Sequence, residues 1–173
     1  MSSTGISIRP ARVGDAEGIA NAHDAAWRDA YRGVIPGVEL ERMIARRGPR
    51  WWNGAIESGA GLLVAVFDEE IVGYALFGRN RTPSMPYSGE ILEIYLVPKC
   101  QGLGLGRRRF NAARRELAEH GYLSLIVWAL ADNEKALAFY RRMGGLSVRR
   151  SEERFGSDVL TRVAFGFVSA SVR

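Results

Sequence analysis

The chain has 173 residues, of which 47% are hydrophobic and 25% are charged. This length predicts one domain over residues 1–173, and the apolar content excludes an intrinsically disordered chain. No run approaches the roughly 20 apolar residues of a spanning helix, and the first residues lack a secretory pattern, which predicts a cytoplasmic protein without a membrane partner. Cys100 is the only cysteine, so an internal disulfide and a multi-cysteine metal site are excluded, and no metal is expected.

The net charge of +5 comes from 24 basic and 19 acidic residues, and most of the basic residues are arginines. Such a surplus is compatible with nucleic acid, a membrane surface or a small anionic ligand. It is also what a GC-rich genome produces without any function. Because the chain has no recognition-helix, zinc or aromatic RNA-binding motif, we expect no nucleic-acid partner.

Strand and helix patterns alternate in the first half of the chain. Residues 6–9 alternate with period two before Pro10, which predicts a strand. Asp15 is a plausible N-cap for a helix that runs to Ala30. Two weaker helical patterns and a hairpin with an acidic turn follow, at residues 38–43, 50–56, 62–67 and 71–77.

The second half begins with a loop at residues 79–88, which contains two prolines. Pro98 ends the strand that follows it, because proline has no N–H to donate. Hairpins and a strand–helix–strand crossover together predict an α/β domain with a mixed sheet. The remaining expected elements are strands at 91–97, 123–130, 146–148 and 159–168, and helices at 106–117 and 133–143.

A glycine-rich turn at residues 101–107 connects a strand to a helix. Glycines let the backbone approach a ligand closely, and the helix start adds roughly half a positive charge, so the turn predicts a phosphate site. Arg107, Arg108 and Arg109 stand in the first helical turn, where each cation costs about 0.3–1 kcal/mol unless an anion is bound. The alternative interpretation is that the three arginines are solvated and bind no anion. The P-loop and dinucleotide patterns both fail to match.

Two motifs carry a resemblance to a known family. Gln101-x-x-Gly104-x-Gly106 matches the [Q/R]-x-x-G-x-[G/A] signature of the GNAT superfamily of acetyl-CoA-dependent N-acetyltransferases. Residues 133–144, one helix and one strand downstream, resemble the family's N-x-x-A-x-x-F-Y-x-x-x-G segment. The opening strand and helix, from Ile8 to Ile19, also resemble the family, so the resemblance covers essentially the whole chain.

The resemblance implies a mixed central sheet of about seven strands, flanked by about four helices and splayed between strands four and five, here residues 90–97 and 123–130. Pantetheine would fill the gap as an added strand on the backbone of Ile94 and Leu96, and the Leu96 amide would polarise the thioester carbonyl. Asn133 would contact the pantetheine arm. The pyrophosphate would be held by Gln101, Gly102, Leu103, Gly104, Leu105, Gly106 and Arg107.

The implied reaction moves an acetyl group from acetyl-CoA to a primary amine by direct attack in a ternary complex. By motif match Tyr140 would protonate the departing thiolate; the alternative is a core tyrosine on an apolar helical face. The resemblance also implies Glu90 as the candidate base, directly or through water, because some family members carry a glutamate at this point of the fourth strand; period two puts it on the strand face of Ile94 and Leu96. Glu93 then falls on the opposite face and is the weaker candidate. The alternative for Glu90 is an ordinary solvated glutamate.

The acceptor site is expected among the first helices, the 79–88 loop and the chain around Phe155. Aromatic residues concentrate there, and they suit the alkyl part of an amine or its cation. For Trp27 the alternative is core packing, His23 is expected to be a satisfied buried histidine, and Arg109 breaks the family's leucine pattern. The candidate substrate-binding residues are Trp27, Tyr31 and Trp128, with Trp51, Trp52 and Tyr87 nearby.

Three classes of function follow from the sequence: an active N-acetyltransferase, a GNAT-fold module that binds acyl-CoA without turnover, and a nucleic-acid-binding domain. Tyr140 and Glu90 favour the enzyme. The acceptor is left unidentified between a small molecule and a protein amine, and an acyl group longer than acetyl stays open. Family members are often dimers, so the resemblance is compatible with a homodimer.

Overall fold

A computed structural model describes residues 5–102 and 104–168, which leaves the predicted ligand residue Leu103 outside the described residues. Within them one seven-stranded sheet has the order β1-β2-β3-β4-β5-β7-β6. The expected mixed sheet is confirmed, with five α-helices where about four were expected. The strands are β1 (Ser7–Pro10), β2 (Gly61–Phe67), β3 (Glu70–Arg79), β4 (Gly89–Leu96), β5 (Ser124–Leu130), β6 (Leu146–Phe155) and β7 (Asp158–Val168). The helices are α1 (Ala16–Tyr31), α2 (Gly37–Ala45), α3 (Pro49–Glu57), the short 3-10 helix η1 (Pro98–Cys100), α4 (Leu105–Glu119) and α5 (Glu134–Arg142).

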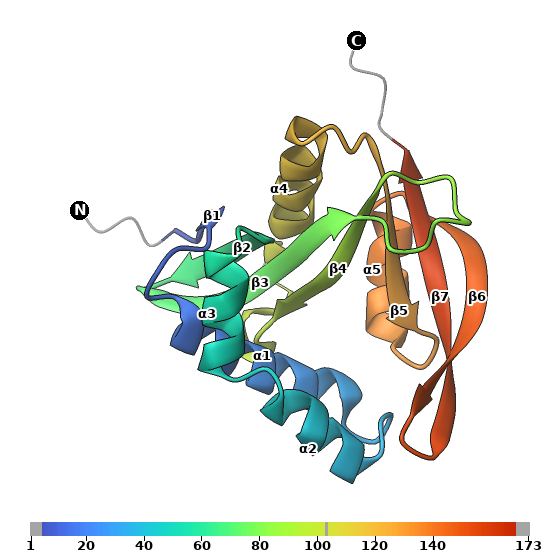
Figure 1. Cartoon of the computed structure of the whole chain (residues 1–173), viewed down its shortest axis with the longest axis horizontal. Coiled ribbons are helices and arrows are strands. Elements are labelled where there is room, and N and C mark those ends of the chain that lie inside the picture. The colour runs from blue at the N-terminus through green and yellow to red at the C-terminus, as the bar shows by residue number, and fades with distance from the viewer. Residues whose placement is uncertain (1–4, 103, 169–173) are drawn as a thin grey trace.

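Helices cover both faces of the sheet (Figure 1). Alternation along β3 shows the two layers: Ala75 and Phe77 pack with residues of α4 and α5, whereas Tyr74 and Leu76 pack with residues of α1 and α3. The α1 stripe that includes Ile19 is buried, as its helical spacing predicts. The sheet therefore separates a face covered by α4 and α5 from a face covered by α1, α2 and α3.

The sheet opens between β4 and β5, the single parallel pair among the described strands. Only residues 89–91 of β4 pair with β5, at residues 125–127. Beyond Ile91 the two strands diverge, as Figure 1 shows. On the side of β4 that faces β5, the backbone at Ile94 and Leu96 consequently has no strand partner among the described residues. The expected splay between strands four and five is confirmed.

A β-bulge in β4 changes which residues share a face. Leu76 and Phe77 of β3 are consecutive, yet their partners are Glu93 and Ile91, so Leu92 is an extra residue in β4. A bulge interrupts the period-two alternation of a strand. Side chains that follow the bulge therefore change face relative to those that precede it.

This bulge makes one sequence prediction wrong. Glu90, Leu92, Ile94 and Leu96 do not share a face: Ile94 belongs to the cluster of α4 and α5, whereas Leu92 packs on the cluster of α1 and α3. Glu93, predicted to face away from Glu90, lines the same pocket as Glu90. Both carboxylates thus come to the face covered by α1 and α2.

The residues that precede α5 and α1 hold their helix starts in different ways. Asn133 caps α5, since its side chain accepts a hydrogen bond from the Ala136 N–H at 3.2 Å. Asp15 makes no side-chain cap bond to α1; its carboxylate accepts from the Arg9 guanidinium and from the Arg12 N–H. The Arg9 hydrogen bond holds the pKa of Asp15 below its usual value. Asp15 therefore ties β1 to the start of α1.

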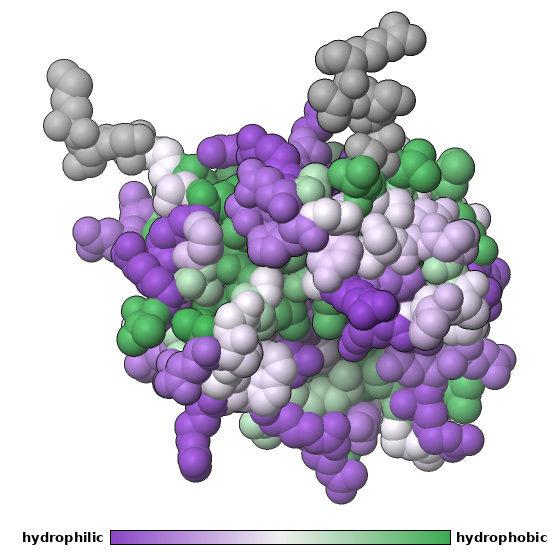
Figure 2. Space-filling model, turned by 45° about the horizontal axis from the view of Figure 1, so that its top comes forward, coloured by the Kyte–Doolittle hydropathy of each residue, from purple (hydrophilic) through white to green (hydrophobic). Residues whose placement is uncertain are grey.

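The last two strands form a longer hairpin than the sequence predicts. β6 was expected over residues 146–148, but it continues to Phe155, where it pairs with Asp158 at the turn. The extension brings Phe155, at the end of β6, into the cluster formed with residues of α1 and α2. In the part of the chain that the structure describes, no helix combines the length and apolarity needed to cross a membrane. Hydrophilic residues project over much of the face shown in Figure 2, with hydrophobic residues visible between them.

Candidate active site

The glycine-rich turn lies between the end of β4 and the start of α4. Gly102 and Gly104 have φ angles of +81° and +75°, a left-handed conformation that side chains rarely adopt. Gly104 caps α4 without any side-chain hydrogen bond, so the first N–H groups of the helix stay available to a ligand. The Gln101 amide donates to the Leu96 carbonyl at 3.3 Å and ties the turn to β4. This arrangement suits an anion such as a phosphate.

Close packing explains a third glycine of the motif. A Cβ at Gly106 would lie 3.1 Å from Cε2 of Phe139 on α5. A glycine here therefore lets α4 and α5 approach closely. That contact places the glycine-rich turn next to α5, the helix that carries Tyr140.

The three arginines that follow the glycines do not behave alike. Arg107 and Arg108 are exposed, but Arg109 is only 5% exposed. Its Nε and Nη1 are buried without a hydrogen-bond partner, and Nη1 would lie 3.4 Å from a Cβ placed at Gly73 of β3. Burial lowers the pKa of Arg109 to about 10. The expectation of three arginines around one anion is thus wrong for Arg109, which points into the protein between α4 and β3.

Tyr140, the predicted acid, lies on the α5 side of the sheet and is 6% exposed. Its ring packs near Phe139 and Phe165, at centroid distances of 5.4 Å and 5.7 Å. Burial raises its pKa above the ordinary value for tyrosine, and the positive charge of Arg109 opposes that shift. The phenol therefore keeps its proton at neutral pH and can donate it to an acceptor.

A pocket of about 290 Å³ lies on the opposite face, beside the opening between β4 and β5. It brings together Trp27, Tyr31 and Trp128 with Glu90, as the sequence predicts. The remaining lining residues are Ile35, Met43, Arg47, Leu76, Arg81, Leu92, Glu93, Tyr95, Ala129, Leu130, Glu153, Phe155 and Arg162.

Three aromatic residues predicted near the acceptor site do not line the pocket. Trp51 is 39% exposed, and the guanidinium of Arg47 lies 3.9 Å from its ring centroid. Trp52 is fully buried in the cluster of α1, α3 and the sheet. Tyr87 packs against the strand pair of β5 and β7, close to Gly166. The rings of Trp52 and Tyr87 therefore pack against apolar residues of the protein and do not line the pocket.

Three aromatic side chains form one wall of the pocket. The Trp27 ring lies 5.3 Å from that of Tyr31 and 5.7 Å from that of Tyr95, measured between centroids. The hydroxyls of Tyr31 and Tyr95 are hydrogen-bonded to each other. Burial raises the pKa of Tyr31 to about 12, so this wall is uncharged at neutral pH.

His23 supports this wall from behind. It is fully buried, and its ring centroid is 4.5 Å from that of Trp27. Both ring nitrogens lack a hydrogen-bond partner, so the expectation of a satisfied histidine is wrong. Burial lowers the pKa of His23 to about 3, which keeps the ring neutral.

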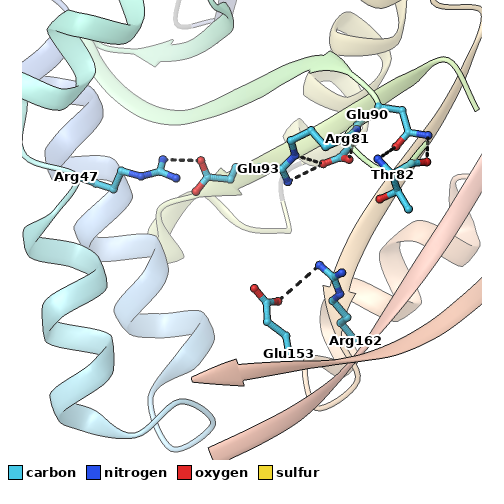
Figure 3. A network of polar contacts seen from close by, with 8 residues as sticks. Arg47, Arg81, Thr82, Glu90, Glu93, Glu153 and Arg162 are labelled. Atoms are coloured by element: carbon cyan, nitrogen blue, oxygen red, sulfur yellow. Dashed lines mark hydrogen bonds and ion pairs between the residues drawn. The ribbon is translucent and has the colours of Figure 1, made fainter. Parts of the chain in front are cut away.

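Glu90 is 1% exposed and is held by Arg81 (Figure 3). Oε2 accepts hydrogen bonds from Nε and Nη2 of Arg81, at 3.0 Å and 2.7 Å. Oε1 accepts from the Arg81 backbone N–H at 3.3 Å. Both oxygens of the predicted base are therefore occupied by one residue.

Glu93 has a free oxygen. Its Oε2 accepts from Nη1 of Arg47 at 2.8 Å, whereas Oε1 is buried without a partner. Burial raises the pKa of Glu93, and the charge of Arg47 opposes that effect. Of the two β4 carboxylates that line the pocket, Glu93 is therefore the one with an oxygen available to a donor.

A third and looser pair lies across the pocket, on β6 and β7. Nη1 of Arg162 is 3.8 Å from Oε2 of Glu153, and its Nε donates to Ser151 at 2.8 Å. The Arg162 guanidinium lies 4.1 Å from the ring centroid of Trp128. The sequence reasoning missed Arg47, Arg81 and Arg162, because they come from separate segments and no motif marks them.

The profile of the Acetyltransferase (GNAT) family matches residues 20–145. The chain belongs to the GNAT acetyltransferase family. It is an acyltransferase, and relatives along its length are named N-acetyltransferases. The uncharacterized N-acetyltransferase YuaI of Bacillus subtilis is 28% identical over 167 residues, which cover 96% of this chain and 95% of the relative.

Another relative of this GNAT protein is longer. A mycothiol acetyltransferase of Paenarthrobacter aurescens is 30% identical over 144 residues, which cover 81% of this chain and 42% of the relative. The GNAT protein thus spans less than half the length of that enzyme.

Solved structures share the GNAT fold. PaiA N-acetyltransferase of Thermoplasma acidophilum, solved with coenzyme A, has a TM-score of 0.73 at 20% identity and covers 91% of this chain and 98% of its own. The putative acetyltransferase yncA of Salmonella typhimurium, solved with acetyl-CoA, has a TM-score of 0.69 at 20% identity and covers 98% and 96%. At these identities the likeness establishes the fold alone.

Proposed function

We propose that this GNAT protein transfers an acetyl group from acetyl-CoA to a primary amine by direct attack in a ternary complex. The observation that carries the proposal is the buried Oε1 of Glu93, which has no hydrogen-bond partner in the described residues and belongs to a residue that lines a pocket beside the open edge of β4. That oxygen can receive an amine proton where the sheet leaves room for a thioester. Relatives solved with coenzyme A and acetyl-CoA support this donor.

The donor would lie along the open edge of β4 and end at the glycine turn. The left-handed Gly102 and Gly104 and the uncapped start of α4 fit a pyrophosphate, with the exposed Arg107 beside it. Backbone groups of Ile94 and Leu96 would pair with the pantetheine arm. Gln101 supports the turn, and Leu105, whose side chain is buried, contributes its backbone N–H. Asn133 uses its side-chain oxygen as the α5 cap, so its amide nitrogen would make the pantetheine contact.

On the acceptor side, an alkyl ammonium with a pKa near 10 must lose a proton before it attacks. We assign this base role to Glu93 in preference to Glu90, because both oxygens of Glu90 are bonded to Arg81. Glu90 then acts through Arg81, by fixing the 79–88 loop at the rim of the pocket. Trp27, Tyr31 and Trp128 would enclose the body of the acceptor.

The proposed reaction has two stages, attack on the thioester and collapse of the tetrahedral intermediate. The neutral amine attacks the thioester carbon, and the Leu96 N–H stabilises the oxyanion that forms. Collapse of the tetrahedral intermediate breaks the C–S bond, and the electron pair goes to sulfur. Glu93 releases the ammonium proton to solvent before the attack and takes the second proton from nitrogen as the amide forms, and Tyr140 gives its proton to the thiolate and is reprotonated by solvent. The products are an N-acetylated amine and CoA thiol.

The test is release of CoA thiol from acetyl-CoA over a panel of primary amines. We expect Glu93→Gln to lower kcat by about 100-fold and to change the KM for acetyl-CoA by less than about threefold. Glu90→Gln is the matched control and should retain more activity than Glu93→Gln. Equal losses in the two variants would remove Glu93 as the base. Binding of acetyl-CoA without thiol release for any amine would instead support a non-catalytic acyl-CoA-binding module.

A further inference from the structure

We infer that the acceptor is a small amino carboxylate, such as a free amino acid with an apolar side chain, and that Arg162 binds its carboxylate. This inference rests on the proposed acetyl transfer and narrows its acceptor. Three features of the pocket carry it: the balance of charge, the orientation of one arginine, and the size and walls of the cavity.

The charges that line the pocket are balanced. Glu90, Glu93 and Glu153 are carboxylates, and three arginines face the same space. A polyamine would gain from the carboxylates but would meet three guanidinium groups that repel it. A ligand with one positive and one negative group finds a partner of opposite sign for each.

The free hydrogen-bonding groups lie on opposite sides of this space. On β4, Glu93 offers the buried Oε1 to an ammonium donor. On β7, the guanidinium carbon of Arg162 lies 4.1 Å from the ring centroid of Trp128, and its contact with Glu153 is long, at 3.8 Å. In Figure 3 its guanidinium points from β7 toward the part of the network that holds Arg81 and Glu90. Because Nε is bonded to Ser151, the edge that can meet a carboxylate with two hydrogen bonds is the terminal one formed by Nη1 and Nη2 of Arg162.

The other two arginines already donate hydrogen bonds to carboxylates of the protein. Arg47 donates to Glu93 at 2.8 Å, and Arg81 makes two side-chain bonds to Glu90. Arg81 is also largely exposed, with 66% of its side chain accessible. Among the arginines that line the pocket, Arg162 is therefore the one without a hydrogen bond to a carboxylate, since its only hydrogen bond within the described part of the chain goes to the Ser151 hydroxyl, and it is the best placed to bind a ligand's anionic group.

The size of the pocket restricts the body of the ligand. Its volume of about 290 Å³ is at the lower end of the range for small-molecule sites. The neutral wall of Trp27, Tyr31 and Tyr95 suits an apolar side chain between the two polar ends. These dimensions fit a free amino acid.

The experiment compares three acceptors that differ at one position: leucine, leucinamide and isopentylamine. Each is tested by thiol release from acetyl-CoA, with a second triad built on phenylalanine. The amide has the least basic amine, so reactivity alone would favour it. We expect kcat/KM for the amino acid to exceed that of its amide and amine by at least about tenfold.

Variants of Arg162 assign this preference. Arg162→Met should lower kcat/KM for leucine by about 30-fold and for leucinamide by less than about threefold, and Arg162→Lys should retain part of the preference. Arg150→Met, an exposed arginine of the same hairpin outside the pocket lining, is the matched control and should change neither value. Thermal melts verify that each variant is folded.

The outcomes separate the two proposals. Turnover of the amines and amides without a preference for the amino acids overturns the inference and leaves the proposed function standing. An equal loss for all three acceptors in Arg162→Met and Arg162→Lys also overturns it, because that pattern indicates a structural role. Absence of thiol release with every primary amine overturns the proposed function itself.

Discussion

The two faces of the sheet treat buried charge in opposite ways. On the face covered by α1 and α2, each carboxylate of the pocket has a guanidinium beside it, as in Glu93 with Arg47. On the face covered by α4 and α5, Arg109 is buried with two nitrogens unpartnered, and this burial lowers its pKa. The face covered by α1 and α2 therefore pairs its charged side chains with opposite charges, whereas the face covered by α4 and α5 leaves the Arg109 cation without a partner among the described residues.

This difference has an energetic consequence. A buried ion pair is costly to break, because the remaining charge stays in a poorly solvated site. A buried charge without a partner is costly as it stands, so its removal relieves the protein. Substitutions on the two faces should therefore change stability in opposite directions, while those in the reaction path should change turnover.

The largest effect is expected at Tyr140, the proposed acid, on the face covered by α4 and α5. Tyr140→Phe removes one oxygen from a well-packed ring, so stability should change little. It also removes the proton for the departing thiolate, and kcat should fall by about 100-fold, or about 2.7 kcal/mol of transition-state free energy. Steady-state kinetics with acetyl-CoA measure this effect. Wild-type turnover in the variant would remove Tyr140 from the mechanism.

Breaking the ion pair on the opposite face should destabilise the protein. Arg47→Met leaves the Glu93 carboxylate, 8% exposed, without its partner. We expect a loss of about 2.5 kcal/mol in the free energy of unfolding, measured by urea denaturation at pH 7. The double variant Arg47→Met with Glu93→Gln should recover part of this loss. If the single and double variants are equally unstable, the buried charge is not the cause.

His23, behind the acceptor wall, should make stability depend on pH. Its pKa is lowered to about 3 in the folded protein from 6.5, so between these values the unfolded chain binds more protons. Stability contributed by neutral His23 is therefore full above pH 6.5 and is lost as the pH falls. From pH 7 to pH 5 we expect a loss of about 2 kcal/mol from this residue. In His23→Leu the pH slope of unfolding should be shallower; an unchanged slope contradicts the assignment.

The smallest effect, of opposite sign, is expected at Arg109. Arg109→Met removes an unpartnered buried cation and keeps most of its volume, so the free protein should gain about 1 kcal/mol of unfolding free energy. Arg109→Lys, which keeps the charge, should show no such gain. Urea denaturation of both variants tests the comparison directly. A loss in Arg109→Met similar to that of Arg47→Met would show that both faces pair their charges.

Much of the donor side could be predicted from the sequence because its signals are local. The left-handed Gly102 and Gly104 stand three residues or fewer from Gln101, and the Asn133 cap bonds to Ala136 three residues away. Such interactions depend on backbone geometry within one turn. A short motif therefore contains nearly all the information needed to place them.

The acceptor side could be predicted only in outline. The aromatic Trp27, Tyr31 and Trp128 do meet in one pocket, but the ion pairs within it join segments far apart, such as Arg47 and Glu93, which are 46 residues apart. Trp52 and Tyr87 carry the same aromatic signal, yet Trp52 lies in the core and Tyr87 is partly buried against the core cluster of β5 and β7. The presence of an aromatic residue in the sequence does not distinguish packing in the core from lining the pocket, because both environments bury aromatic rings.

The sequence by itself determined the family, the order of the elements and the glycine turn, because these depend on spacing along one chain. The tertiary structure alone decided which β4 carboxylate has a free oxygen and which arginine is buried. The bulge at Leu92 shows the reason: one extra residue, set by pairing with β3, brings Glu93 to the pocket face. A strand's register depends on its neighbours, so the pattern within the strand could not reveal it.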